Sequence, residues 1–336
     1  MVNIDQIDWA SLERLRAGFL SGEVASGPYW RARSDLESYD ATFGERIGWK
    51  WDSVLRELAR RNWRPSSRNA LDWGCGSGIA GRRVIETFGP ENFDSLDLWD
   101  HSPLASGYAA DRARRSFPSL AVHPAENSPD WNASENSPGL LIVSHVLNEL
   151  PPEGRRNLLS LASRAEEILW VEPGTHAASR ELIAVREELL PHFDIIAPCP
   201  HQETCPMLAE GNQRHWCHFF APPPAGIQND SGWVRFGHQA GIDLRSLPYS
   251  YLVLARRTNR GTAALLPAGS SRIIGRPEHF KGFARIFACE ASGAESLELQ
   301  KREAPDLFKA LKRETEHPLY QWQRDNRRIR SPREAE

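Results

Sequence analysis

No apolar run in the 336-residue sequence approaches the ~20 residues that a membrane-spanning helix requires. Residues 1–15 have neither the basic and apolar segments of a signal peptide nor the Arg-rich, acid-poor character of a transit peptide. The formal net charge is only −3, so any attraction to a polyanion must come from a local basic surface. These absences favour a cytoplasmic location and argue against a membrane partner, and we expect no DNA partner.

Cysteine is scarce, with five residues in the chain, yet four of them have a spacing that indicates one shared site. Cys199, Cys205 and Cys217 lie within nineteen positions, and Cys289 follows far downstream. In a reducing compartment, clustered cysteines are more often metal ligands than disulfides. The C-x5-C-x11-C spacing lacks the paired C-x2-C or C-x4-C knuckles of zinc ribbons and zinc fingers. We therefore predict a metal site built from wide loops.

The metal itself stays open at this point, because four thiolates complete either a tetrahedral zinc site or a cubane iron–sulfur cluster. Irregular loops bounded by prolines suit the larger cluster better. Three nearby histidines, His201, His215 and His218, keep a Cys3His zinc site possible as well. The alternative without a metal is four unrelated buried cysteines. Cys75 lies apart in a glycine-rich loop, where we expect a small packing residue.

Hydrophobic periodicity predicts an α/β chain with additions at both ends. Helical spacing at 9–20 and 45–62 indicates an N-terminal helical cap, and from Arg68 short apolar strands alternate with helices. Such alternation is typical of a parallel sheet covered on both faces. The expected parts are a cap (1–66), an α/β domain (67–198), a cysteine-rich metal-binding loop (199–220), a β-rich C-terminal module that supplies Cys289 (221–316), and a disordered tail (317–336).

A glycine-rich turn follows the first apolar strand, with Asp72 ahead of Gly74, Gly76 and Gly78. Glycines let a backbone approach a ligand closely, and the following helix offers unpaired N–H groups. Asp72 suits the amino group of a cationic ligand, and Asp100 ends the next strand, where it could hold ribose hydroxyls. The D-x-G-x-G-x-G pattern resembles class I S-adenosylmethionine methyltransferases, which implies a Rossmann-like domain that binds S-adenosylmethionine. Nicotinamide binding and a degenerate site are the alternatives.

The segment that would face the substrate is less informative. Residues 144–150 read SHVLNEL and lack the Asn/Asp-Pro-Pro-aromatic motif of many amino-N methyltransferases. Carbon-5 methylation of pyrimidines needs a thiolate nucleophile, and Cys75 in the cofactor loop is the only cysteine available in this domain. His145 and Glu149 are candidate acid/base groups, although both could equally be satisfied polar residues at a strand end. We assign no catalytic residue.

Motifs around the cysteines carry a more specific resemblance. APCPHQETCP followed by WCHF, after EPGT, resembles the mitochondrial small ribosomal subunit assembly methyltransferase-like family and its bacterial relatives. SHVLNELP, YSYLVLARR and LFKALKRE extend the similarity over most of 68–313. The resemblance implies a [4Fe-4S] cluster held by Cys199, Cys205, Cys217 and Cys289, and contact with the small ribosomal subunit and its rRNA. The chain departs from the family in lacking a recognisable transit peptide, as expected for a bacterial or otherwise non-imported member.

Basic residues near the fourth cysteine form the candidate surface for RNA. They are Arg256, Arg257, Arg260, Arg272, Arg276, Lys281, Arg285, Lys309, Lys312 and Arg313. They could contact phosphates or simply be a solvated face, and the aromatics among them are more often core than base-stacking residues. The leading hypothesis is an S-adenosylmethionine-binding, [4Fe-4S]-containing protein that methylates small-subunit rRNA or binds it during assembly. The alternatives are a non-catalytic assembly factor with a degenerate methyltransferase domain, and a zinc-containing methyltransferase of another substrate.

Overall fold

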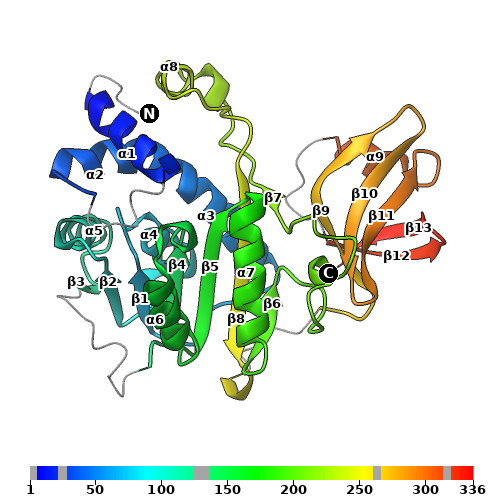
Figure 1. Ribbon diagram of the computed structural model, residues 1–336, viewed down its shortest axis with the longest axis horizontal. Coiled ribbons are helices and arrows are strands. Elements are labelled where there is room, and N and C mark those ends of the chain that lie inside the picture. The colour runs from blue at the N-terminus through cyan, green and yellow to red at the C-terminus, as the bar shows by residue number, and fades with distance from the viewer. Residues whose placement is uncertain (1–5, 22–28, 125–136, 260–265, 313–318, 336) are drawn as a thin grey trace.

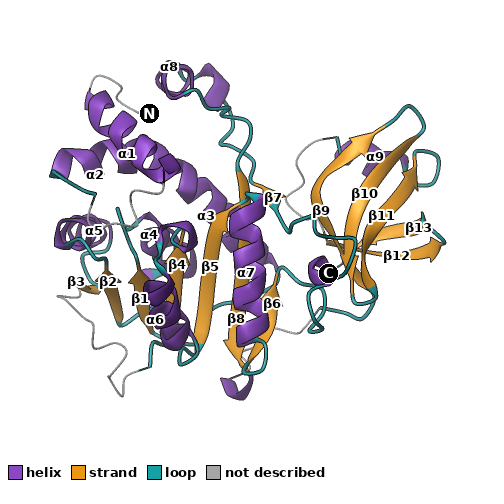
Figure 2. Cartoon of the chain, in the orientation of Figure 1, coloured by secondary structure: helices purple, strands orange, loops and turns teal. Residues whose placement is uncertain are grey.

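The computed structural model describes residues 6–21, 29–124, 137–259, 266–312 and 319–335 (Figure 1). Helices packed around one large sheet form the first part of the chain, and a small β-barrel forms the second (Figure 2). In the described part of the chain, no helix is both long and apolar enough to cross a membrane.

The large sheet has eight strands, in the order β3-β2-β1-β4-β5-β8-β6, and β7 pairs with β8. Its strands are β1 (Asn69–Trp73), β2 (Ser95–Trp99), β3 (Ala121–Pro124), β4 (Leu140–Ser144), β5 (Glu167–Pro173), β6 (Phe193–Ala197), β7 (Phe219–Phe220) and β8 (Pro248–Arg256). The first five are parallel to their neighbours, whereas β8 is antiparallel to both β5 and β6. The α/β methyltransferase-type fold is thus confirmed, with a mixed rather than a parallel sheet.

Helices cover both faces of the sheet, as the alternation of strands and helices predicts. They are α1 (Trp9–Ser21), α2 (Arg33–Tyr39), α3 (Glu45–Arg60), α4 (Ile79–Phe88), α5 (Pro103–Ser116), α6 (Pro152–Ala162), α7 (His176–Leu189) and α8 (Ser231–Ala240). Adjacent residues of β4 show the two faces, since Ile142 packs with α3, α4 and α5 and Val143 packs with α6 and α7. Period-2 alternation in a strand that is buried on both sides produces these two apolar cores.

Helix α8 follows the cysteine-rich loop but packs against the N-terminal helices (Figure 1). Trp233 lies 4.6 Å from Trp49, and Phe236 lies 5.2 Å from Phe43, between ring centres. Residues 221–256 were expected to belong to the C-terminal module. They instead supply α8 and the antiparallel strand β8 to the larger part, because their apolar side chains are buried in its core.

The smaller part is a closed barrel in the order β10-β11-β13-β12-β9. Its elements are β9 (Ser270–His279), β10 (Phe283–Glu290), β11 (Gly293–Gln300), α9 (Pro305–Ala310), β12 (Leu319–Asp325) and β13 (Arg328–Glu334). The expectation of a disordered tail at 317–336 is wrong, because β12 and β13 close the barrel. Leu319, Tyr320 and Ile329 fill its core, and the many charged residues between them point outward.

A buried ion pair joins the barrel to the larger part. Arg272 of β9 is 1% exposed and contacts Glu57 of α3 through two nitrogens, at 2.6 Å and 3.2 Å. Its Nε also donates to the Pro198 carbonyl at 2.9 Å, and the Tyr251 hydroxyl donates to Glu57 at 2.6 Å. The two carboxylate oxygens and the guanidinium are therefore hydrogen-bonded despite their burial, as a buried ion pair requires. The junction lies beside the first cysteine, Cys199.

Candidate functional site

The glycine-rich turn between β1 and α4 adopts a backbone that favours glycine at three positions. Gly74, Gly76 and Gly78 have φ values of +69°, +50° and +73°, which glycine reaches without steric cost. Gly74 and Gly78 are also closely packed, since an added Cβ would lie 2.7 Å from a Val146 methyl carbon and 2.7 Å from the Ala109 Cβ. Around Gly76 the nearest atom is 4.0 Å away, so its missing side chain leaves space above the turn.

Of the two acids predicted to flank this turn, only Asp100 lines the cavity above it. Its carboxylate accepts the backbone N–H groups of Gly76 and Ser102, each at 2.9 Å, and each oxygen keeps a lone pair for a further donor. Asp72 lies beneath the turn, fully buried, and accepts the Gly81 N–H at 2.9 Å. Its other oxygen has no hydrogen-bond partner in the described structure. Asp72 thus supports the turn from below.

Burial raises the pKa of the Asp72 carboxyl to about 7 from its usual 3.8. Because the folded-state pKa is the higher one, this group adds stability that is complete below about pH 4 and is lost as the pH rises through 7. Asp72→Asn removes the titration but keeps an oxygen for the Gly81 N–H. We expect the free energy of unfolding of the wild type to fall from pH 4 to pH 8 relative to the variant, as measured by urea titration. Parallel pH profiles would contradict the raised pKa.

The cavity above the turn has a volume of about 370 Å³ and an aromatic wall that the sequence analysis missed. Trp73 and Trp99 stack at 4.5 Å between ring centres where β1 and β2 end. Tyr29 and Trp30, which precede α2, line the cavity from the N-terminal segment. No sequence motif predicts that Tyr29 and Trp30 line the cavity, because only the packing of α1 and α2 brings them there. The size and the mixed lining are those of a small-molecule site.

The end of β4 brings two ionisable side chains to the same cavity. His145 has a positive φ of +57°, and its Nε2 lies 3.0 Å from the Lys50 Nζ on α3. Glu149 accepts the Tyr29 hydroxyl at 3.1 Å. Burial lowers the pKa of His145 well below its usual value and raises the pKa of Glu149 to about 8. A neutral imidazole and a protonated carboxyl therefore line the cavity near pH 7, and the imidazole is a weak base there because burial and Lys50 disfavour its protonated form.

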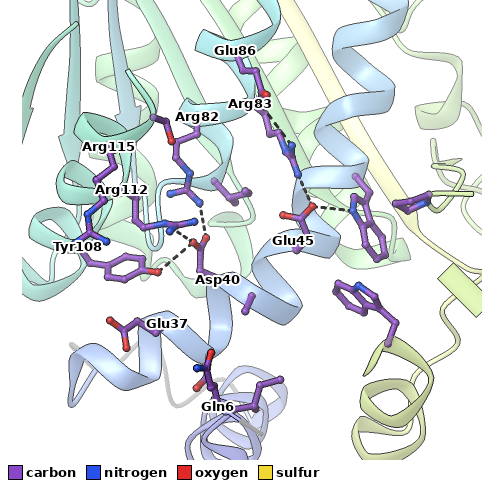
Figure 3. Close-up of a pocket in the computed structure, with 18 of the residues that line it drawn as sticks. Gln6, Glu37, Asp40, Glu45, Arg82, Arg83, Glu86, Tyr108, Arg112 and Arg115 are labelled. Carbon is purple, nitrogen blue, oxygen red and sulfur yellow. Dashed lines mark hydrogen bonds and ion pairs between the residues drawn. The ribbon is translucent and has the colours of Figure 1, made fainter. Parts of the chain in front are cut away.

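A larger groove of about 1400 Å³ runs along α2, α4 and α5 on another side of the N-terminal helices (Figure 3). Arginines and acids both line it. Asp40 pairs with Arg82 at 2.6 Å and with Arg112 at 3.2 Å, and Glu45 pairs with Arg83 at 2.6 Å. Because these arginines and acids form ion pairs with each other, the groove attracts neither anions nor cations strongly. We assign it no ligand.

The four cysteines predicted as ligands meet at the junction between sheet and barrel. Cys199, Cys205 and Cys217 line a cavity of about 30 Å³. Cys289 comes from β10, and its Sγ lies 3.6 Å from the His201 Nε2. Burial raises the pKa of Cys205 to about 12 and the pKa values of Cys217 and Cys289 well above 9, and the neighbouring thiolates add to each rise. The thiols are thus close enough to interact electrostatically.

A buried cation faces these thiols. The Arg186 Nε lies 3.3 Å from the Cys199 Sγ, and Arg186 is only 2% exposed. In the described residues, no three His, Cys, Asp or Glu side chains already stand as a set of metal ligands. The four thiols nevertheless suit a metal as ligands. The raised pKa values of Cys205, Cys217 and Cys289 mean that these thiols are protonated without a metal, and a bound metal would replace those protons. Arg186 would offset part of the resulting negative charge.

The three histidines near the cysteines do not gather around them. His201 alone contacts a cysteine, Cys289. His215 stacks on Phe287 at 4.2 Å, and His218 stacks on Trp216 at 4.5 Å. The Cys3His alternative therefore depends on His201. Cys75 is buried in the glycine-rich turn, and burial raises its pKa well above 9.

The predicted basic surface is divided by the fold. Arg272 is buried in the ion pair with Glu57, and Arg276 lies over the Phe220 ring at 3.9 Å. Lys281 and Arg285 are exposed at one end of the barrel. Two further basic residues of the prediction, Arg260 and Arg313, lie outside the described residues.

Solved structures with a similar chain fold include several methyltransferases. Magnesium protoporphyrin IX methyltransferase from Synechocystis PCC 6803 with bound SAM has 14% identity and a TM-score of 0.40, over 75% of this chain and 94% of that one. The 16S rRNA methylase RmtB has 12% identity and a TM-score of 0.37, over 75% and 76%. An rRNA methylase from Escherichia coli has 14% identity and a TM-score of 0.35, over 55% and 69%. Nothing about the substrate follows from likeness at this level.

The sequence itself places the chain more firmly. No curated protein matches it. The family described as "Mitochondrial small ribosomal subunit Rsm22" matches residues 50–316, a span that includes the glycine-rich turn, the β4 end and all four clustered cysteines. The match covers well over half of the chain, so this protein belongs to the mitochondrial small ribosomal subunit Rsm22 family.

Proposed function

We propose that this protein binds S-adenosylmethionine and a [4Fe-4S] cluster and acts on the rRNA of the small ribosomal subunit, by methylating it or by binding it during assembly. The observation that carries the proposal is the cavity above the glycine-rich turn, with Asp100 at its edge, in a chain of a small-subunit family. A reducing compartment, the cytoplasm, suits the free cysteines.

S-adenosylmethionine would supply an electrophilic methyl group at this cavity. The glycine-rich turn would offer its backbone to the ligand, and Asp100 would accept hydrogen bonds from the ribose. Trp73 and Trp99 would provide an apolar wall for the base. His145 and Glu149 line the same cavity and would lie beside the group to be methylated.

The cysteine site would be structural. Cys199, Cys205, Cys217 and Cys289 would hold the cluster, and four protein thiolates leave no iron open to a substrate. The chain also has no C-x3-C-x2-C motif of the kind used in radical chemistry on S-adenosylmethionine. Because the ligands come from the loops after β6 and from β10, the cluster would clamp the barrel to the sheet.

A non-catalytic assembly factor is the second candidate, and one observation favours it. The polar groups at the β4 end already have protein partners, since Lys50 contacts His145 and Tyr29 donates to Glu149. In that case a ligand bound in the cavity would only stabilise the fold. A zinc-containing methyltransferase of another substrate is the third candidate, and metal analysis separates it from the first two.

A cell lacking this gene separates the first two candidates when it is complemented with the wild type or with Gly76→Ala. The added methyl group would enter the cavity, so we expect S-adenosylmethionine affinity to fall about tenfold or more. A nucleotide-resolution map of rRNA methylation should lose one modification in the deletion strain and in Gly76→Ala. Gly241→Ala is the matched control, because Gly241 has a similar φ of +60° far from the cavity. Poor subunit maturation with an unchanged methylation map would refute the enzyme and favour the assembly factor.

A further inference from the structure

The strand order of the C-terminal barrel is that of a nucleic-acid-binding fold. The order β10-β11-β13-β12-β9 closes a five-stranded Greek-key barrel, with β11 parallel to β13 and with α9 between β11 and β12. This is the arrangement of the OB-fold, which binds oligonucleotides or oligosaccharides on the face of its second and third strands and on the adjacent loops. Here the second and third strands are β10 and β11.

One end of that face is already covered by the cysteine-rich loop. Phe287 of β10 stacks on His215 at 4.2 Å between ring centres. The side-chain amide of Asn212 donates to the Ala294 carbonyl of β11 at 3.4 Å. The opposite end, at the turn between β9 and β10, carries neither of these two contacts in the described part of the chain.

This opposite end presents an aromatic pair to solvent. Phe280 and Phe283 stack with 4.5 Å between ring centres and an angle of 12°. The turn is closed by the Phe280 N–H, which donates to the Phe283 carbonyl at 2.9 Å. Phe280 is 41% exposed, and only Leu208 joins it as an exposed large hydrophobic residue in the described structure. This partly exposed ring beside a second ring offers an aromatic surface on which a base can stack once the Arg285 guanidinium, which lies over the Phe280 ring, moves aside.

Cations surround this pair. The Arg285 guanidinium lies 5.2 Å from the centre of the Phe280 ring. Lys281, Lys301 and Arg302 are exposed, and the Lys301 N–H donates to the Gly282 carbonyl at 2.9 Å, which joins the two loops that carry them. The nearby acid Glu303 is paired with Arg330, and Glu278 is paired with Arg285 at 2.8 Å. Positive charge therefore remains on the two loops.

The two loops enclose a shallow depression of about 530 Å³. Its lining residues are Gly282, Gln300, Lys301, Arg302 and Pro305. A cationic depression beside a stacking ring suits a chain of alternating phosphates and bases. An oligosaccharide, the other ligand of this fold, carries no phosphate to match these cations.

We propose that this end of the barrel binds single-stranded RNA, with an unpaired base stacked on Phe280 and phosphates at Lys281, Lys301 and Arg302. These four residues are named the Phe280 platform. The platform is a second site, separate from the cofactor cavity. The inference rests on the proposed function in one respect, which is the choice of RNA rather than DNA as the ligand. Unpaired bases are required because a duplex hides both faces of each base.

Fluorescence anisotropy of the full-length protein with labelled RNA decamers tests the platform. We expect a single-stranded decamer to bind more tightly than a blunt duplex of the same length, and Phe280→Ala to weaken binding to the single strand by about 5- to 100-fold. Leu208→Ala is the matched control, since Leu208 is the other exposed apolar side chain, at 50%. The double change Lys301→Gln, Arg302→Gln should lower the salt dependence of binding by about 1.4 in log–log slope.

Unchanged affinity of Phe280→Ala, or equal affinity for duplex and single strand, would overturn the platform. Because Phe280 is exposed, its replacement leaves the barrel core intact, and an unchanged melting temperature would verify that. The binding assay needs neither S-adenosylmethionine nor methyl transfer. A lost methylation in the deletion strain together with unaltered binding by Phe280→Ala would therefore refute the platform and leave the proposed function standing.

Discussion

Replacing Arg272 with alanine is expected to lower the free energy of unfolding by about 3–5 kcal/mol. The change takes away the partner 2.6 Å from the buried Glu57 carboxylate, which keeps only the more distant Arg61 at 3.7 Å, and it removes the hydrogen bond to the Pro198 carbonyl. Urea titration of the purified protein measures the loss. We also expect limited proteolysis to separate the barrel from the sheet in this variant, because the broken pair is the buried ionic contact between the two parts.

The matched control is Arg68→Ala, which breaks an exposed ion pair with Asp94 at 2.8 Å. Exposed pairs contribute about 0–1 kcal/mol, so the two variants should differ clearly. Replacing Arg272 and Glu57 together with methionine should recover part of the stability, because no unpaired carboxylate stays buried, while Arg61, 3.7 Å from Glu57, loses its own partner. An Arg272→Ala variant as stable as Arg68→Ala would contradict the role of this pair.

The pair also has a pH signature. Burial alone would raise the pKa of Glu57, but the charge and hydrogen bonds of Arg272 outweigh it and hold the pKa below the usual 4.5. A lowered folded-state pKa gives stability that is present above pH 4.5 and is lost as the pH falls through the folded value. The stability difference between wild type and Arg272→Ala should therefore shrink in acid, in the opposite sense to the Asp72 effect.

Cys289→Ser is expected to lose the bound metal and most of the soluble yield. Metal binding is coupled to folding when the ligands come from separate segments, and Cys289 is the proposed ligand on the barrel. The test measures the iron, sulfide and zinc content and the visible absorption of the protein after anaerobic purification. We expect a brown wild-type protein with a [4Fe-4S] content and a colourless variant.

Cys75→Ser is the matched control, because Cys75 is also buried but lies in the glycine-rich turn. It should keep the metal content of the wild type. Retained iron in Cys289→Ser would show that the fourth ligand is a different residue, with His201 at 3.6 Å the first to test. A colourless wild type with stoichiometric zinc would refute the cluster.

Local signals made the methyltransferase part predictable. The strand expected at 140–144 is β4, and the strand expected at 193–197 is β6, because buried strands are short apolar runs between polar turns. The glycine-rich turn was recognisable for the same reason, since three positions require positive φ. The spacing of the cysteines likewise predicts one site, and three of the four line the same small cavity.

Pairing between distant segments was not predictable in this way. The apolar sequence of β8 does not indicate whether the strand is parallel or antiparallel to its neighbours. About fifty residues also separate β8 from its partner β6. The tail was misjudged because β12 and β13 turn their charged side chains outward and bury few residues. The sequence suggests that Arg272 either contacts phosphates or lies on a solvated face, and its burial against Glu57 is visible only in the folded chain.

By itself, the sequence determined the class of the fold, the glycine-rich turn, and the four cysteines proposed as one metal site. Those features depend on residue types at short range or on the family motifs around them. The tertiary structure alone decided which basic side chains are exposed and which are buried. It also decided that Asp72 supports the turn while Asp100 lines the cavity, and that the last two strands close the barrel. Each of these depends on which surfaces meet, and the free energy of burial and charge pairing is settled only when distant segments come into contact.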